Sequence, residues 1–129
     1  MQPVVRAPRH HLAALVIAGG MLGSALRVGV VALVPSTGFP WATVIVNLTG
    51  SLVVGWMLPT LHSRSRRQRR VAFGAVGVAA AYTTFATFAI DAMDLVHAGR
   101  WSSVAGYLAI SVLGGLAAAA VGHSLGERS

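Results

Sequence analysis

Long apolar stretches, separated by short polar connections, make up most of the chain. Four of them are long enough to cross the hydrocarbon core of a bilayer, which takes roughly 20 mostly apolar residues. Lipid cannot satisfy exposed backbone groups, and the alternating pattern of a membrane barrel is absent, so we predict helices. The prediction is an all-α membrane protein, a single four-helix transmembrane domain over residues 1–129, with spans at about 12–34, 41–61, 71–96 and 104–123.

The composition of the chain and the absence of certain motifs exclude several classes of function. Only 10% of the 129 residues are charged, whereas a soluble domain carries about a quarter. The chain has no Cys, which excludes disulfides, thiolate metal sites and cysteine nucleophiles. It also lacks a nucleophile–base pair and a phosphate-binding glycine loop, so we predict that it is not an enzyme. The five His lie at span ends or outside the spans, where we expect solvated side chains rather than metal ligands: His10, His11, His62, His97 and His123.

The first apolar stretch has an alternative interpretation. It follows Arg6 and Arg9, as the apolar core of a cleaved signal peptide would. Its length, the presence of Arg27 inside it and the three further spans favour a transmembrane helix.

All ten basic residues behind the net charge of +7 are Arg, and their distribution predicts the topology. With four spans, the two termini and the connection 62–70 share one side of the membrane. That side holds eight Arg, and the other side holds only Arg27 and Arg100. We therefore predict a multi-pass protein of the cell membrane with both termini cytoplasmic. The run Arg64–Arg70 lies between two spans, so we interpret it as an anchor beside lipid headgroups and expect no nucleic-acid partner.

Small residues predict close helix packing. Gly19 and Gly23 are four residues apart in the first span, and Ser51 and Gly55 are four apart in the second. Such pairs let helix backbones approach closely. We expect a compact bundle that oligomerises, since four thin helices hardly enclose a pathway alone.

Polar residues inside the second and fourth spans are candidate functional groups. Thr43 and Asn47 lie four apart on one helix face, as do Tyr107 and Ser111. Each also has a structural interpretation. Asn47 then bonds another helix, Tyr107 lies at the membrane interface, and Ser111 bonds its own helix backbone.

The third span carries a run of Thr and Phe and ends in acids. Three Thr within five residues predict caps or satisfied backbone groups at a broken turn. Phe85 and Phe88, taken alone, are typical of lipid-facing or core packing. Asp91 and Asp94 fall near the end of the span, and the absence of a mid-span carboxylate argues against proton-coupled transport.

Three elements, in this order and spacing, resemble the CrcB/Fluc family of fluoride channels. Residues 19–27 (GGMLGSALR) resemble its first-span GGxxGxxxR pattern. Residues 39–51 (FPWATVIVNLTGS) resemble its P-x-G-T-L-x-V-N-x-x-G-S element. Residues 83–91 (TTFATFAID) resemble its TTFSTF-x-x-E element. The resemblance runs from about residue 19 to residue 111.

The resemblance implies a passive, fluoride-specific channel that exports cytoplasmic fluoride and reduces its toxicity. Family members are antiparallel dimers of four-helix subunits with two pores, and the third helix is broken near its middle. By position, the anion pathway of this chain would comprise Asn47, Phe85, Phe88, Thr43, Tyr107 and Ser111.

The resemblance also implies a structural sodium ion at the dimer centre, held by backbone carbonyls at the break. The carbonyls of Ala80 and Thr83 fall at those positions. The family usually has Gly-Gly before the break, where this chain has Ala80-Ala81, so we expect this sodium site to be altered or partly supplied by a partner. A further departure is Ala86, where the family usually has Ser. Arg27 would lie at a vestibule that attracts anions, or snorkel to the interface.

The strong Arg asymmetry conflicts with an antiparallel homodimer, because each orientation must then be available to one sequence. We therefore favour a heterodimer with a second CrcB-type subunit that inserts in the opposite orientation.

Two other functions are compatible with four short spans. A small multidrug-type exporter relies on a buried Glu in its first span, and this chain has none. A non-transporting, holin-like assembly subunit would explain the Gly and Ala content, though not the polar residues.

Overall fold

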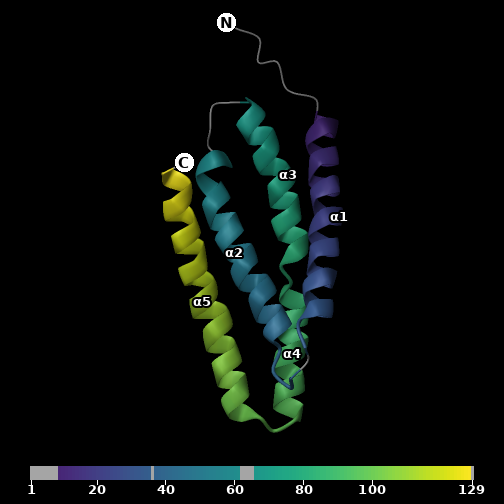
Figure 1. Ribbon diagram of the computed structural model, residues 1–129, viewed down its shortest axis with the longest axis vertical. Coiled ribbons are helices and arrows are strands. Elements are labelled where there is room, and N and C mark those ends of the chain that lie inside the picture. The colour runs from purple at the N-terminus through teal and green to yellow at the C-terminus, as the bar shows by residue number, and fades with distance from the viewer. Residues whose placement is uncertain (1–8, 36, 62–65, 129) are drawn as a thin grey trace, which may run out of the picture.

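The computed structural model describes residues 9–35, 37–61 and 66–128. Arg6, His62 and Arg64 of the sequence analysis lie outside these ranges. The described residues form helices and no strand (Figure 1). The helices are α1 (Arg9–Leu33), α2 (Trp41–Leu61), α3 (Arg66–Tyr82), α4 (Phe85–His97) and α5 (Trp101–Glu127).

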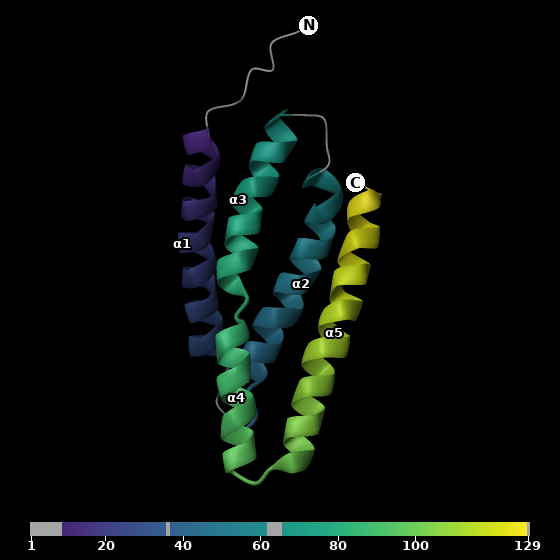
Figure 2. The ribbon, with the colours of Figure 1, turned by 180° about the vertical axis from the view of Figure 1, so that it is seen from behind.

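Four segments of the described chain are long and apolar enough to cross a membrane, which confirms the predicted all-helical architecture with four such spans. The third of them takes in most of α3 and all of α4, which follow one another along nearly the same line (Figures 1 and 2). The segments are His10–Leu33, Trp41–Pro59, Arg70–His97 and Trp101–Glu127.

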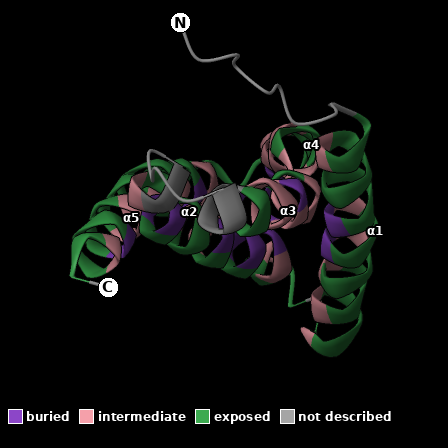
Figure 3. Cartoon of the chain, turned by 90° about the horizontal axis from the view of Figure 1, so that it is seen from above, coloured by how far each residue is buried: buried purple, intermediate pink, exposed green. Residues whose placement is uncertain are grey.

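The long helices stand in an open row, in the order α5, α2, α3 and α1 (Figures 1 and 3). Most of the surface is exposed, and the buried residues lie where helices meet (Figure 3). Large apolar side chains point outward, among them Met21 and Leu116. In water such a surface would be costly, but a bilayer or a second subunit covers it without penalty.

Glycines set the two closest helix pairs, as the small-residue spacing predicts. In α1, a Cβ added to Gly19 would lie 2.1 Å from the carbonyl oxygen of Gly74 in α3, and one added to Gly23 equally close to that of Val78. In α2, a Cβ on Gly55 would lie 2.1 Å from the carbonyl oxygen of Ala119 in α5. Backbones this close gain dispersion contacts that larger residues would prevent.

The connections between α1 and α2 and between α4 and α5 meet at one end of the bundle. Each contains a glycine with positive φ, Gly38 at +77° and Gly99 at +67°. Arg100, which precedes α5, donates a hydrogen bond from its guanidinium to the carbonyl of Gly38. This contact joins two loops that are 62 residues apart in sequence.

Candidate functional site

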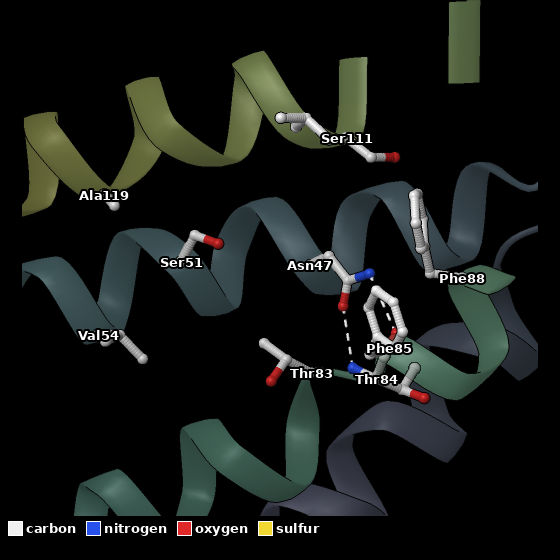
Figure 4. A pocket seen from close by; sticks show the side chains of 10 residues that line it. Asn47, Ser51, Val54, Thr83, Thr84, Phe85, Phe88, Ser111 and Ala119 are labelled. Carbon is white, nitrogen blue, oxygen red and sulfur yellow. Dashed lines mark hydrogen bonds between the residues drawn. The ribbon is translucent and has the colours of Figure 1, made fainter. Parts of the chain in front are cut away.

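The side chain of Asn47 reaches from α2 to the two residues that separate α3 from α4. Its Oδ1 accepts a hydrogen bond from the Thr84 backbone N–H at 3.0 Å, and its Nδ2 donates to the Thr84 carbonyl at 3.3 Å (Figure 4). The structural interpretation of Asn47 as an interhelical bond is therefore confirmed. Because an amide nitrogen carries two hydrogens, Thr84 takes only one of them.

The threonines between the helices act as caps, which is one of the roles that the sequence predicts. Thr84 is extended, with φ −149° and ψ 116°, and its Oγ1 accepts the N–H of Thr87 at 3.1 Å. This is the usual N-cap arrangement at the start of a helix. The Thr83 hydroxyl donates back to the carbonyl of Ala79 at 3.0 Å.

These side-chain bonds take two amide hydrogens away from backbone carbonyls. In a continuous α-helix, Thr84 N–H would donate to Ala80 and Thr87 N–H would donate to Thr83. Here the first goes to Asn47 and the second to Thr84 Oγ1, so both carbonyls lose those donors. No described non-glycine residue has a positive φ, so Ala80 and Ala81 adopt ordinary backbone angles.

A cavity of about 430 Å³ lies beside Asn47, between α2, α4 and α5 (Figure 4). Ser111 lies on its α5 side, and the Ser111 Oγ is buried without a hydrogen-bond partner in the described structure. The sequence-based alternative, in which Ser111 bonds its own helix backbone, is therefore wrong. The cavity is lined by Asn47, Ser51, Val54, Thr83, Thr84, Phe85, Phe88, Ser111, Val112 and Ala119.

Thr43 and Tyr107 form a second polar cluster, which is centred on Asp91. The Thr43 hydroxyl donates to Asp91 Oδ2 at 2.5 Å, and the Tyr107 hydroxyl donates to the same oxygen at 3.2 Å. Thr43 is 6% exposed and Tyr107 is fully buried. The interfacial interpretation of Tyr107 is therefore wrong. Neither residue lines the cavity of Asn47.

Asp91 is the residue of this cluster that sequence reasoning missed. In the sequence it is the acid of the Thr-Phe element near the end of a span, and the pattern assigns it no role. In the structure it is half-buried in α4 and joins α2 to α5. The sequence does contain a signal for its role: Asp91 lies three positions after Phe88, so both residues share one face of the helix.

Aromatic rings connect the cavity with the Asp91 cluster. The ring of Phe88 lies 5.2 Å from that of Tyr107, and Phe39 meets Tyr107 edge-on at 5.8 Å. Phe85 lies 5.8 Å from Phe88, yet it is 81% exposed. Phe88 thus takes part in the core packing that the sequence predicts, whereas Phe85 presents its ring to the outside of this subunit.

Other candidates lie apart from the cavity. Arg27 is half-buried in α1 and does not line it. In the described ranges His10, His11, His97 and His123 are exposed, and no group of three His or acidic side chains there is placed to hold a metal ion. The described site therefore offers uncharged donors, an amide and a hydroxyl, beside aromatic rings. Such groups suit a small anion that has lost part of its hydration.

Sequence comparison identifies proteins that are similar to this chain. Curated proteins named Fluoride-specific ion channel FluC match part of the chain. The relative from Thermus thermophilus is 51% identical over 47 residues, 34% of this chain and 38% of the relative. The relative from Xanthomonas euvesicatoria pv. vesicatoria is 47% identical over 53 residues, 39% of this chain and 40% of the relative.

A third relative, Fluoride-specific ion channel FluC 1 of Halobacterium salinarum, is 52% identical over 42 residues, 33% of this chain and 35% of its own. Each alignment spans less than half of the relative's length. The names are those of ion channels rather than enzymes. The model of the family described as CrcB-like protein, Camphor Resistance (CrcB), matches residues 14–123, which is most of the chain. The chain is therefore a multi-pass membrane protein that belongs to the CrcB family.

Proposed function

We propose that this chain is a subunit of a fluoride-specific passive anion channel that exports cytoplasmic fluoride. The observation that carries the proposal is the cavity beside Asn47, which combines a spare amide hydrogen, the unpaired Ser111 hydroxyl and two Phe rings. The names of the relatives support the same ion.

The donor set suits fluoride for a physical reason. A pore must replace the water of a strongly hydrated ion, and neutral hydroxyl and amide groups do so without holding the ion too tightly. Aromatic rings add a positive edge. None of the Arg side chains that the structure describes lines the cavity, so none of them places a full positive charge beside the anion there. Arg27 then contributes at a distance, as a vestibule charge that raises the local anion concentration.

Thr43 and Tyr107 continue the proposed pathway beyond Phe88. Their hydroxyls donate to Asp91 in this structure, so an anion that accepts hydrogen bonds from them must compete with the Asp91 carboxylate. We assign Asp91 a positioning role, because it holds both hydroxyls at one point between α2, α4 and α5.

The break between α3 and α4 is proposed to hold a structural sodium ion within one interrupted span. Support comes from the carbonyls of Ala80 and Thr83, because the N–H groups of Thr84 and Thr87 that a continuous helix would direct to them go to side chains instead. Backbone oxygens are suitable ligands for a hard cation. A bound sodium would supply fixed positive charge beside the break and satisfy those oxygens.

The functional unit is proposed to be an antiparallel heterodimer. The highly exposed Phe85 and the open row of helices indicate that this subunit forms only part of a pathway. The Arg asymmetry favours one orientation, with cytoplasmic termini, so the opposite orientation requires a second CrcB-type chain. Liposomes with this chain alone are expected to show little fluoride flux, and co-reconstitution with the second chain is expected to restore it. Robust flux from this chain alone would contradict the heterodimer.

Fluoride efflux from loaded vesicles separates the proposal from its alternatives. A multidrug-type exporter would move organic cations and leave fluoride inside, and a holin-like subunit would move neither selectively. The proposal requires fluoride efflux driven by an inside-negative potential, in the direction that removes fluoride trapped after hydrogen fluoride enters the cell.

A further inference from the structure

A second large hollow of the described molecule lies between α1 and α3, away from the cavity of Asn47. This groove has a volume of about 910 Å³. Apolar side chains form its walls, with Leu15 and Leu22 from α1 and Val71 and Val78 from α3. Leu22 is 55% exposed and Val71 is 66% exposed, so the groove opens on the outer surface of this subunit.

Close helix packing gives the groove its floor. A Cβ on Gly19 would clash with the backbone of Gly74, so the two helices touch there and leave a channel of small residues between the larger walls. The groove runs along α1 from His11 to Leu22. At about 1.5 Å per residue this is about 16 Å, close to half of the roughly 30 Å hydrocarbon core of a bilayer. Its length therefore matches one leaflet.

One end of the groove is basic. His11 and Arg70 line it at the same end, and both side chains are exposed. The structure gives Arg70 no hydrogen bond or ion pair with any described residue. The acids of the chain lie elsewhere: Asp91 and Asp94 are in α4, and Glu127 ends α5, at the opposite side of the row from α1 (Figure 2).

We propose that the groove is a binding site for an anionic phospholipid, with one acyl chain between α1 and α3 and the phosphate at Arg70 and His11. The guanidinium offers the planar donor pair that phosphate oxygens accept. Basic pockets between transmembrane helices at the cytoplasmic face are typical sites for anionic headgroups. The Arg-rich end of this chain is the end that the positive-inside rule assigns to that face.

Quenching of a tryptophan in the groove tests this site directly. In a chain whose native Trp41, Trp56 and Trp101 are replaced by Phe, Leu15→Trp places the reporter in the groove. Met21→Trp, on an exposed part of α1 that does not line it, is the matched control. Both are reconstituted in vesicles that contain either brominated phosphatidylglycerol or brominated phosphatidylcholine.

We expect the groove reporter to favour brominated phosphatidylglycerol roughly fivefold, which is the effect of one basic residue at the surface. The control reporter is expected to show no preference. Arg70→Gln should remove the preference, whereas Arg128→Gln, an exposed Arg at the end of α5, should leave it. Equal quenching by both lipids, or a preference that survives Arg70→Gln, would overturn the proposal.

Absence of quenching by either lipid would also overturn it, because a second copy of the chain would then cover the groove. Circular dichroism and size-exclusion chromatography check that each variant folds. The readout does not depend on ion flux, so its failure would leave the proposed channel function standing, and a failed flux assay would leave the lipid site standing.

Discussion

Asn47 and Thr84 exchange two hydrogen bonds, so that a side chain of α2 takes the place of a backbone partner where α3 gives way to α4. The Thr84 N–H is thereby withdrawn from the α3 ladder, and the Thr84 hydroxyl is left to cap α4. The Asn47 side chain thus bonds the residue that lies between α3 and α4 and caps α4, and the same side chain lines the cavity.

Replacement of Asn47 by Asp tests this dual role. Asp keeps the acceptor for the Thr84 N–H, but it loses the donor to the Thr84 carbonyl and places a negative charge in an anion path. We expect fluoride flux to fall by about 10- to 150-fold, since a hydrogen bond to a charged group is worth about 1.5–3 kcal/mol. A variant that elutes like the native protein and conducts normally would refute the pore assignment.

Ser111→Ala separates function from stability. Its buried hydroxyl has no partner to lose, so we expect an unchanged or slightly higher melting temperature in detergent. Fluoride flux should fall about tenfold, because the anion loses one donor. Ser124→Ala, an exposed serine of α5 that bonds its own helix, is the control and should leave both quantities unchanged. Normal flux in Ser111→Ala would argue against a role in the pathway.

The Asp91 cluster makes a prediction about stability. Thr43→Val removes a 2.5 Å hydrogen bond to a carboxylate, and Tyr107→Phe removes a longer one while keeping the ring contacts. We expect losses in the free energy of unfolding of about 1.5–3 kcal/mol and about 1 kcal/mol, respectively. Both losses should shrink in an Asp91→Asn background, as a double-mutant cycle requires for a shared partner. Losses that persist unchanged there would show that Asp91 is not the relevant acceptor.

Glycine packing can be tested with a matched pair. An added Cβ at Gly55 meets the backbone of Ala119, whereas one at Gly29 meets nothing within 4 Å. Gly55→Ala should lower stability by about 1–3 kcal/mol, because the α2–α5 pair must separate. Gly29→Ala should be neutral or stabilising by up to about 1 kcal/mol through helix propensity. Thermal unfolding in detergent measures both, and equal effects would contradict the packing described for α2 and α5.

The four helical spans can be predicted from the sequence because lipid cannot satisfy exposed backbone groups, which restricts how a chain can cross a membrane. Apolar length alone identifies spans, and the spacing of Gly19 and Gly23 reports the close approach of α1 to another helix. The capping by Thr84 could also be predicted, because three Thr within five residues of a span favour side-chain bonds to free backbone groups at a broken turn.

The site was harder to predict, because its partners are distant in sequence. Asp91 meets Thr43 across 48 residues and Tyr107 across 16, and an acid near a span end looks solvated in the sequence. Tyr107 is buried by rings from two other segments, Phe39 and Phe88. Whether Ser111 bonds its own backbone depends on its rotamer, which residue spacing does not encode.

Fluoride efflux from liposomes is the most direct measurement of the central proposal. Vesicles loaded with potassium fluoride receive this chain together with a CrcB-type subunit of opposite Arg bias, and valinomycin sets the potential while an electrode records the fluoride released. We expect rapid fluoride efflux that exceeds the background of protein-free vesicles and no matching efflux of chloride. Vesicles that stay impermeable to fluoride with both folded subunits present would contradict the account.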